Sequence, residues 1–263
     1  MFVDIDGTLL CDEGQLSPGA DGAIREARAN GNLVVLCTGR SEPLIPDVLR
    51  EVGYDGAITS GGARAEVGGA EVWDAHFAKD ELRGLVELLD ARGVPYLIES
   101  GSDLFGGPGL REALVALHPN HPELAGLPLA PLARLRADAV GKVVALSIDA
   151  GAVEAAVEAI KTLGASLHVV AGTIPVPFGA SADISPIGVN KGSAVAAVLA
   201  HLGIDAADAV AIGDNYNDAE MFAACGLSIA MGNADPAVQA LATEVTGTCA
   251  AGGVAQAFDR HQL

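Results

Sequence analysis

The first residues with types and spacing suited to chemistry are two aspartates one position apart, Asp4 and Asp6. The apolar residues around them predict the end of a buried strand, and Gly7-Thr8 breaks that strand at its carboxyl end. Because side chains alternate along a strand, the two carboxylates can share a site only if the strand ends between them. An ordinary Asp-Gly turn with one solvated carboxylate would also fit. Ligands bind at the carboxyl ends of strands in open α/β sheets, so the pair becomes a candidate site if other segments join it.

Three later segments also place polar residues directly after apolar runs: Thr38-Gly39-Arg40, Asn190-Lys191-Gly192, and Gly213-Asp214 with Asn217-Asp218. Each has a plain structural explanation as a turn, a solvated lysine or carboxylates at a helix start. The helix dipole stabilises carboxylates at a helix start and disfavours a cation there. Lys191 therefore favours a functional interpretation more than its neighbours do.

The elements that must position these residues alternate in the manner of a parallel sheet covered by helices. Predicted strands cover residues 2–5, 33–37, 56–59, 209–212 and 227–230; predicted helices cover 17–30, 41–52 and 190–203; and a hairpin covers 64–77. The run 33–37 is continuously apolar, which is typical of a central strand buried on both faces. Asn217 and Glu220 have the spacing of a capping box.

Between residues 79 and 183 the pattern changes to an independent α, β, α, β block. Helices are predicted over 81–92 and 152–163, with strands over 94–98, 142–148 and 167–170. The intervening stretch from Gly106 to Pro131 is rich in glycine and proline and predicts irregular structure. Because the first pattern resumes at Asp183, we expect one domain from residues 1–78 and 184–263, and a second domain inserted at 79–183.

Composition excludes several classes of function. The chain of 263 residues has a net charge of −19, which argues against nucleic acid or an anionic membrane surface as a partner. It has no apolar run of about 18 residues and no export signal. The four cysteines lack paired metal-type spacing, which predicts reduced thiols in a cytoplasmic protein: Cys11, Cys37, Cys225 and Cys249.

Taken together, the segments resemble the four ordered motifs of the haloacid dehalogenase superfamily: Asp4-Ile5-Asp6-Gly7-Thr8, Thr38-Gly39-Arg40, Lys191-Gly192, and Gly213-Asp214 with Asn217-Asp218. The large α/β insert between the second and third motifs is similar to that of the Cof-type sugar-phosphatase branch. The resemblance covers essentially the whole chain. It implies an α/β fold with a Rossmann-like parallel-sheet core and an inserted α/β cap domain that sets substrate specificity.

The resemblance also implies roles for individual residues. Asp4 would be the nucleophile that forms an aspartyl-phosphate, and Asp6 the general acid and base. Lys191 would stabilise charge on the phosphoryl oxygens. Mg²⁺ would be held by the carboxylates of Asp4 and Asp214 and by the backbone carbonyl of Asp6, with Asp218 holding metal-bound water. Contacts to the phosphate or the rest of the substrate would come from Thr38, Gly39, Arg40, Ser60, Gly61 and Asn217. For Arg40 a plain surface cation is the competing interpretation.

The expected activity is Mg²⁺-dependent hydrolysis of small phosphorylated metabolites, sugar phosphates foremost, by a monomer or small homo-oligomer. Two alternatives stay open: a phosphomannomutase-like phosphosugar mutase, and a non-catalytic metabolite-binding protein on the same scaffold. The second is disfavoured because the whole set of motif residues is intact: Asp4, Asp6, Lys191, Asp214 and Asp218. One departure concerns Ser60-Gly61-Gly62-Ala63, which stands where relatives carry Ser-Asn-Gly-Ala. The chain therefore lacks the amide that relatives place there.

Overall fold

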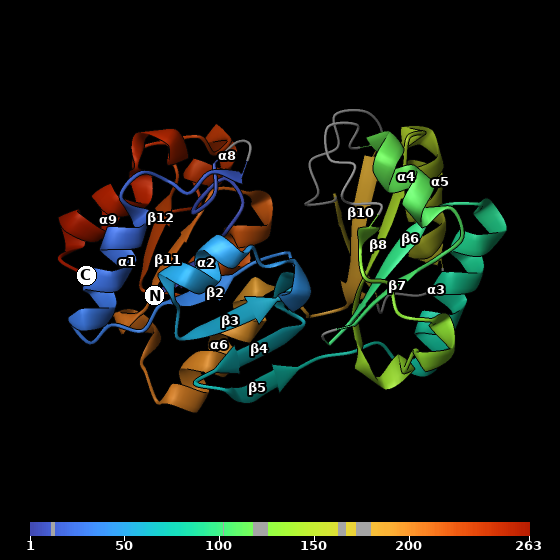
Figure 1. Cartoon of the computed structure of the whole chain (residues 1–263), viewed down its shortest axis with the longest axis horizontal. Coiled ribbons are helices and arrows are strands. Elements are labelled where there is room, and N and C mark those ends of the chain that lie inside the picture. The colour runs from blue at the N-terminus through green and yellow to red at the C-terminus, as the bar shows by residue number, and fades with distance from the viewer. Residues whose placement is uncertain (12–13, 102, 118–125, 163–166, 172–179) are drawn as a thin grey trace. The chain divides into compact units, whose positions relative to one another are not determined.

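The computed structural model describes the chain except for residues 12–13, 102, 118–125, 163–166 and 172–179 (Figure 1). The described residues form two compact units. Unit 1 combines Met1–Trp73 with Asn190–Leu263, and unit 2 is Asp74–Val189. The described part of the chain contains no helix with both the length and the apolar character needed to cross a bilayer.

Unit 1 is built on an eight-stranded sheet with the order β13-β12-β11-β1-β2-β3-β4-β5. Its strands are β1 (Phe2–Val3), β2 (Val35–Cys37), β3 (Gly56–Thr59), β4 (Arg64–Val67), β5 (Ala70–Asp74), β11 (Val210–Gly213), β12 (Leu227–Ala230) and β13 (Glu244–Val245). The pairs from β13 to β3 are parallel, and β4 runs antiparallel to β3. The predicted α/β class with a parallel-sheet core is confirmed.

Both faces of this sheet carry a hydrophobic core. Side-chain alternation in β1 sends Val3 into one core and Phe2 into the other. The first core is covered by α1 (Ala20–Ala29), α2 (Asp47–Val52) and α9 (Gly253–His261), and α1 lies beside α9 in Figure 1. The second is covered by α6 (Lys191–Leu202), α7 (Ala219–Ala223) and α8 (Pro236–Gln239). Burial on both sides explains why β2 is apolar at every position.

Two helix predictions in unit 1 have different outcomes. The helix after Asn190 is confirmed as α6. Asn190 caps it, because the Oδ1 atom of Asn190 accepts the N–H of Ser193 at 2.8 Å. The continuous helix predicted over 41–52 is wrong. A 3-10 turn covers Glu42–Leu44, and α2 begins only at Asp47. Pro46 separates the two pieces, because proline lacks an N–H and pushes the preceding residue into extended backbone.

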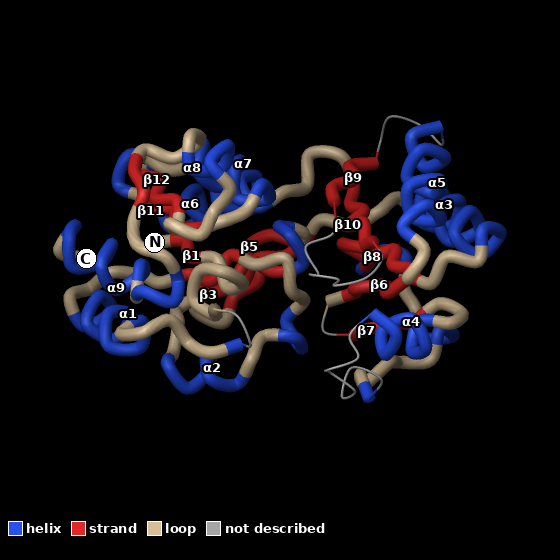
Figure 2. The backbone as a smooth tube through the Cα atoms, turned by 90° about the horizontal axis from the view of Figure 1, so that it is seen from above, coloured by secondary structure: helices blue, strands red, loops and turns tan. Residues whose placement is uncertain are grey.

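Unit 2 is built on a five-stranded antiparallel sheet with the order β7-β6-β8-β10-β9. Its elements are α3 (Lys79–Arg92), β6 (Tyr96–Ser100), β7 (Asp103–Gly106), α4 (Leu110–Leu117), β8 (Val140–Ser147), α5 (Ala150–Thr162), β9 (Leu167–Ala171) and β10 (Ala180–Pro186). The helices α3 and α5 lie side by side, as Figure 2 shows. Their buried side chains share one core with those of the sheet. Unit 2 therefore has a core of its own.

Parts of unit 2 differ from the sequence-based assignment. α4 lies in the stretch expected to be irregular, and its apolar residues Leu110 and Leu114 are buried despite the nearby glycines and prolines. β7, which ends at Gly106 where that stretch begins, was not predicted either. Asp183–Pro186, expected to begin the return to the first domain, belong to β10 and pair with β8 and β9. The units accordingly divide at Trp73/Asp74 and Val189/Asn190 rather than at 78/79 and 183/184.

Candidate active site

The candidate site lies at the carboxyl ends of three neighbouring strands of unit 1. β1 pairs in parallel with β11 on one side and β2 on the other. Their carboxyl ends therefore meet at one edge of the sheet, where Asp4 follows β1, Thr38 follows β2 and Asp214 follows β11. The three short apolar strands position these residues, since each strand ends at its first polar position.

Lys191 joins two carboxylates of the site. Its Nζ lies 2.7 Å from Oδ1 of Asp4 and 2.6 Å from Oδ1 of Asp218, and all three side chains are buried. Although burial lowers the pKa of Lys191, the charges of Asp218 and Asp4 raise it above its ordinary value, so the ammonium stays charged. The first turn of α6 can approach closely because Gly192 packs against the backbone of Glu220, where a Cβ would lie 2.3 Å from a carbonyl oxygen.

Asp218 organises the loop that carries Asp214. One of its oxygens is bonded to Lys191, and the other accepts the N–H groups of Asp214 at 2.9 Å and Asn215 at 3.0 Å. Gly213 makes this possible, because a Cβ there would lie 2.4 Å from the Asp218 carboxyl group. Both oxygens of Asp218 are thus bonded within the protein, which suits a residue that orders the site from behind.

Asp214 lies against the loop that follows β1. The hydroxyl of Thr8 donates to its Oδ1 at 3.2 Å. Gly7 has a φ of 79°, and a Cβ at this position would lie only 2.1 Å from Oδ2 of Asp214. Glycine is therefore required at position 7 for two reasons, its backbone conformation and its close approach to Asp214. Burial, followed by the charge of Asp218, raises the pKa of Asp214 to about 6.

The carboxylates suit a hard divalent cation. Asp4, Asp214 and Asp218 each offer one oxygen, and these three atoms lie within 4.8 Å of one another. Burial raises the pKa of Asp4 well above its usual range, although the charge of Lys191 acts to lower it. Oxygen ligands of this kind are those that Mg²⁺ prefers. Because Asp218 already uses both oxygens, Asp4 and Asp214 are the better-placed ligands.

The segments around Thr38 and Ser60 are joined by backbone bonds. Arg40 donates its N–H to the Thr38 hydroxyl at 3.0 Å, Ser60 donates to the Arg40 carbonyl at 2.7 Å, and Gly61 donates to the Thr38 carbonyl at 3.0 Å. Ser60 holds a φ of 51°, a left-handed conformation that is uncommon for a residue with a side chain. The structure thus brings Thr38, Gly39, Arg40, Ser60 and Gly61 into one group.

Arg40 is directed at Asp6 and also at the backbone. Its Nε and Nη2 bind the two oxygens of Asp6 at 2.8 and 2.6 Å, and its Nη1 donates to the carbonyl of Leu44 at 3.0 Å. Hydrogen bonding to Asp6 raises the pKa of Arg40 above its ordinary value. Arg40 is therefore not a free surface cation. Nor is it available for a substrate contact alone, because Asp6 and the Leu44 carbonyl already accept its hydrogen bonds.

Asn217 does not have the capping contact predicted from its spacing. The helix α7 begins at Ala219 with Asp218 before it, and the preceding 3-10 turn is capped by Asn215, whose Oδ1 accepts the N–H of Tyr216. The Oδ1 atom of Asn217 is buried and has no hydrogen-bond partner among the described residues. A role for Asn217 in substrate binding stays a prediction.

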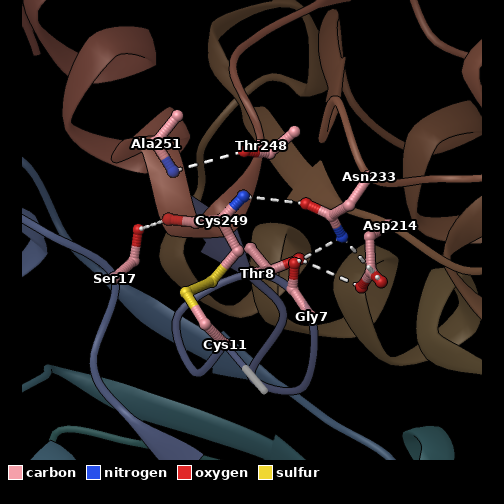
Figure 3. The surroundings of a disulfide bond; sticks show 9 residues. All are labelled: Gly7, Thr8, Cys11, Ser17, Asp214, Asn233, Thr248, Cys249 and Ala251. Carbon is pink, nitrogen blue, oxygen red and sulfur yellow. Dashed lines mark hydrogen bonds between the residues drawn. A yellow bond between two sulfur atoms is a disulfide. The ribbon is translucent and has the colours of Figure 1, made fainter.

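Sequence reasoning missed two groups of residues near the site. Thr8 and Asn233 both bond to Asp214, and their signal was their place in the loops that follow strands at the same sheet edge. Cys11 and Cys249, expected as thiols, form a disulfide across a sequence separation of 238 (Figure 3). Nothing in their spacing indicated this, because the fold alone brings the loop after β1 beside the segment before α9.

Comparisons with known proteins find relatives over nearly the whole chain. A family profile described as haloacid dehalogenase-like hydrolase matches residues 1–258. A phosphoglycolate phosphatase of Halobacterium salinarum is 30% identical over 261 residues, which cover 99% of this chain and 96% of the relative. An HMP-PP phosphatase of Cronobacter sakazakii is 28% identical over 241 residues, covering 89% and 84%. The solved structure of a HAD subclass IIB sugar phosphatase has a TM-score of 0.80 at 21% identity, covering 99% of this chain and 98% of the other.

Proposed function

Because this chain belongs to the haloacid dehalogenase-like hydrolase family and is a phosphatase of phosphorylated metabolites, we propose that it hydrolyses sugar phosphates with Mg²⁺ through an aspartyl-phosphate. The observation that carries the proposal is the buried pair of Asp4 and Lys191, whose Oδ1 and Nζ atoms are 2.7 Å apart at the carboxyl end of β1. A carboxylate in such surroundings is a nucleophile held in a fixed orientation.

In the proposed reaction, a carboxylate oxygen of Asp4 attacks phosphorus and the bond to the leaving alcohol breaks. Lys191 holds Asp4 through Oδ1 and offsets negative charge as the phosphoryl group approaches. Asp6 gives a proton to the leaving oxygen. It then removes a proton from the water that cleaves the acyl phosphate and releases inorganic phosphate. Thr38 and the N–H of Gly39 are proposed to bind phosphoryl oxygens.

Mg²⁺ bound by Asp4 and Asp214 would neutralise the phosphate ester and allow an anionic nucleophile to approach it. Thr8 holds Asp214 from one side, and Asp218 orders the loop that carries it. These contacts fix the direction of the Asp214 carboxylate before any ligand arrives. Such outer contacts typically change metal affinity by about 10–100-fold when they are removed.

We propose that unit 2 acts as the cap that selects the substrate. It has its own sheet and its own core, which a separately moving domain requires. The structurally similar HAD subclass IIB protein is described as a sugar phosphatase, and this favours a phosphorylated sugar over other metabolites. A cytoplasmic location stays a prediction, and the Cys11–Cys249 disulfide counts against it because disulfides persist mainly in oxidising compartments.

A panel of phosphorylated metabolites tests the proposal, with released inorganic phosphate as the readout. We expect turnover of one or more sugar phosphates in Mg²⁺, none after EDTA, and none with Asp4→Asn. Formation of mannose 6-phosphate from mannose 1-phosphate without phosphate release would instead indicate a mutase. Binding of a metabolite without turnover of any ester, p-nitrophenyl phosphate included, would indicate a non-catalytic binding protein.

A further inference from the structure

Asn233 lies between the candidate metal ligand and the loop that carries the nucleophile. It follows β12 by three residues, and its side-chain Nδ2 donates to the carbonyl of Gly7 at 2.9 Å and to Oδ2 of Asp214 at 3.5 Å (Figure 3). The bond to Gly7 is the shorter of the two. Asn233 therefore fixes the backbone that runs from Asp4 to Thr8 and reaches Asp214 from the same side.

The carboxylate of Asp214 is bounded on both of its oxygens. Thr8 donates to Oδ1, while Oδ2 faces Gly7 and the amide of Asn233. Because Gly7 leaves no room for a side chain beside Oδ2, a small shift of the Gly7 backbone would press directly on Asp214. A residue that holds the Gly7 carbonyl thereby also limits the rotation of Asp214.

The orientation of the Asn233 amide is itself determined by Cys249. The N–H of Cys249 donates to Oδ1 of Asn233 at 2.8 Å, so the NH₂ group must face Gly7 and Asp214. Cys249 is held in turn by the bond from the Ser17 hydroxyl to its carbonyl, at 2.8 Å, and by the disulfide to Cys11. Figure 3 shows this chain of contacts from the disulfide to Asp214.

We propose that Asn233 is a positioning residue for the metal-binding carboxylate of Asp214, and that the Cys11–Cys249 disulfide supports it by holding Cys249 in place. The proposal rests on the proposed function insofar as Asp214 binds Mg²⁺. Asn233 is exposed, so its side chain adds little buried surface. Its three bonds nevertheless converge on groups of the site and on the crosslinked segment, which indicates that orientation is its main contribution.

The test measures Mg²⁺ binding by titration calorimetry on the oxidised full chain without any phosphate ester. Asn233→Ala should weaken Mg²⁺ binding by about tenfold while the melting temperature of the metal-free protein stays close to that of the wild type. Asn233→Ser serves as a second variant should the first fold poorly. The matched control is Thr248→Ala, which removes a hydroxyl that accepts the N–H of Ala251 in the same segment but does not reach the site. The control should bind Mg²⁺ as the wild type does.

A double-mutant cycle tests the part played by the disulfide. Cys11→Ser should weaken Mg²⁺ binding several-fold in the wild-type background and much less in the Asn233→Ala background, because the two residues act through one contact. Unchanged Mg²⁺ affinity in Asn233→Ala or Asn233→Ser would overturn the proposal for Asn233, and additive losses would overturn the link to the disulfide. Failure of the wild type to bind Mg²⁺ would overturn both. Mg²⁺ binding without turnover of any ester would refute the proposed function and leave the inference about Asn233 intact.

Discussion

Arg40 donates hydrogen bonds to both oxygens of Asp6: Nη2 lies 2.6 Å from Oδ1 and Nε lies 2.8 Å from Oδ2. Planar two-point contact of this kind fixes direction as well as charge. Both side chains are partly exposed, so the pair contributes little to stability. The contact with Arg40 instead fixes the orientation of Asp6, the proposed acid and base. During the reaction, Asp6 must exchange a hydrogen bond from Arg40 for one with the leaving oxygen.

Arg40→Ala should therefore impair proton transfer more than phosphoryl attack. We expect kcat to fall by about 10²-fold on an alkyl phosphate, whose leaving group needs a proton, and much less on p-nitrophenyl phosphate, whose leaving group does not. Arg40→Lys should lie closer to the alanine variant than to the wild type, because an ammonium cannot bind two oxygens side by side. Equal losses on both substrates would show that Arg40 does not act through Asp6.

Substitutions of Asp4 and Asp6 should have different effects on the two substrates in the same assay. Asp4→Asn should abolish turnover of every substrate, because a neutral amide cannot attack phosphorus. Asp6→Asn should lose activity on alkyl phosphates yet still form some phosphoenzyme from p-nitrophenyl phosphate. Circular dichroism checks that both variants stay folded. Turnover near the wild-type rate in Asp4→Asn would refute its assignment as the nucleophile.

Asp214 predicts a dependence of stability on pH. Burial and the charge of Asp218 raise its pKa to about 6 from 3.8, so the folded state holds a proton that the unfolded chain has already lost in that interval. The metal-free protein should therefore lose stability as the pH rises from about 4 to about 6. Asp214→Asn should remove the part of this loss that Asp214 causes, leaving the part due to Asp4, and should raise the free energy of unfolding at about pH 7.5 by about 1–3 kcal/mol.

Urea unfolding in EDTA at several pH values measures this effect. The advantage of the Asp214→Asn variant should shrink as the pH falls toward 4 and disappear below about 3, where the wild-type carboxyl is protonated in both states. Adding Mg²⁺ should stabilise the wild type and have little effect on the variant. A variant that is less stable than the wild type at about pH 7.5 would contradict the raised pKa.

The disulfide should contribute strongly to stability. It closes a loop across a sequence separation of 238, for which the chain-entropy treatment gives about 5 kcal/mol and measured losses are typically about 2–5 kcal/mol. The double variant Cys11→Ser/Cys249→Ser should lower the free energy of unfolding by about 2–5 kcal/mol. Dithiothreitol should then have no further effect on the stability of this variant. Cys225→Ser, which removes a thiol outside the crosslink, is the control.

Removing unit 2 tests its proposed role as a cap. Deleting Asp74–Val189 and joining Trp73 to Asn190 through a short Gly/Ser linker leaves both cores of unit 1 complete. The shortened chain should fold, bind Mg²⁺ and act on p-nitrophenyl phosphate, while its discrimination among sugar phosphates falls far more. An unfolded product in circular dichroism would refute the independence of unit 1.

The parts of the fold that sequence predicted are those fixed by local pattern. The continuous apolar run ending at Cys37 is typical of a strand buried on both faces, and polar residues after three parallel strands are expected to meet at one edge of the sheet. The helix after Asn190 was similarly determined by its cap. In each case the signal lies within a few residues, so no knowledge of distant contacts was needed.

The features that sequence did not predict depend on contacts between distant segments. Cys11 and Cys249 meet only because α1 and α9 pack on the same face of the sheet. The two hydrogen bonds between the Arg40 guanidinium and the Asp6 carboxylate depend on the direction of both side chains. Residue type alone does not determine that direction. Two errors were local: Pro46 divided a predicted helix, and the glycines and prolines near α4 concealed its apolar stripe.

The crosslink between Cys11 and Cys249 makes almost the whole polypeptide a covalently closed ring. A protease that cuts once anywhere inside that ring, including anywhere in unit 2, yields two pieces that cannot part. On a denaturing gel without reductant the nicked protein would migrate as one species, and only reduction would separate it into fragments. Backbone cleavage and physical dissociation are thus two separate events for this molecule, and the second requires a thiol.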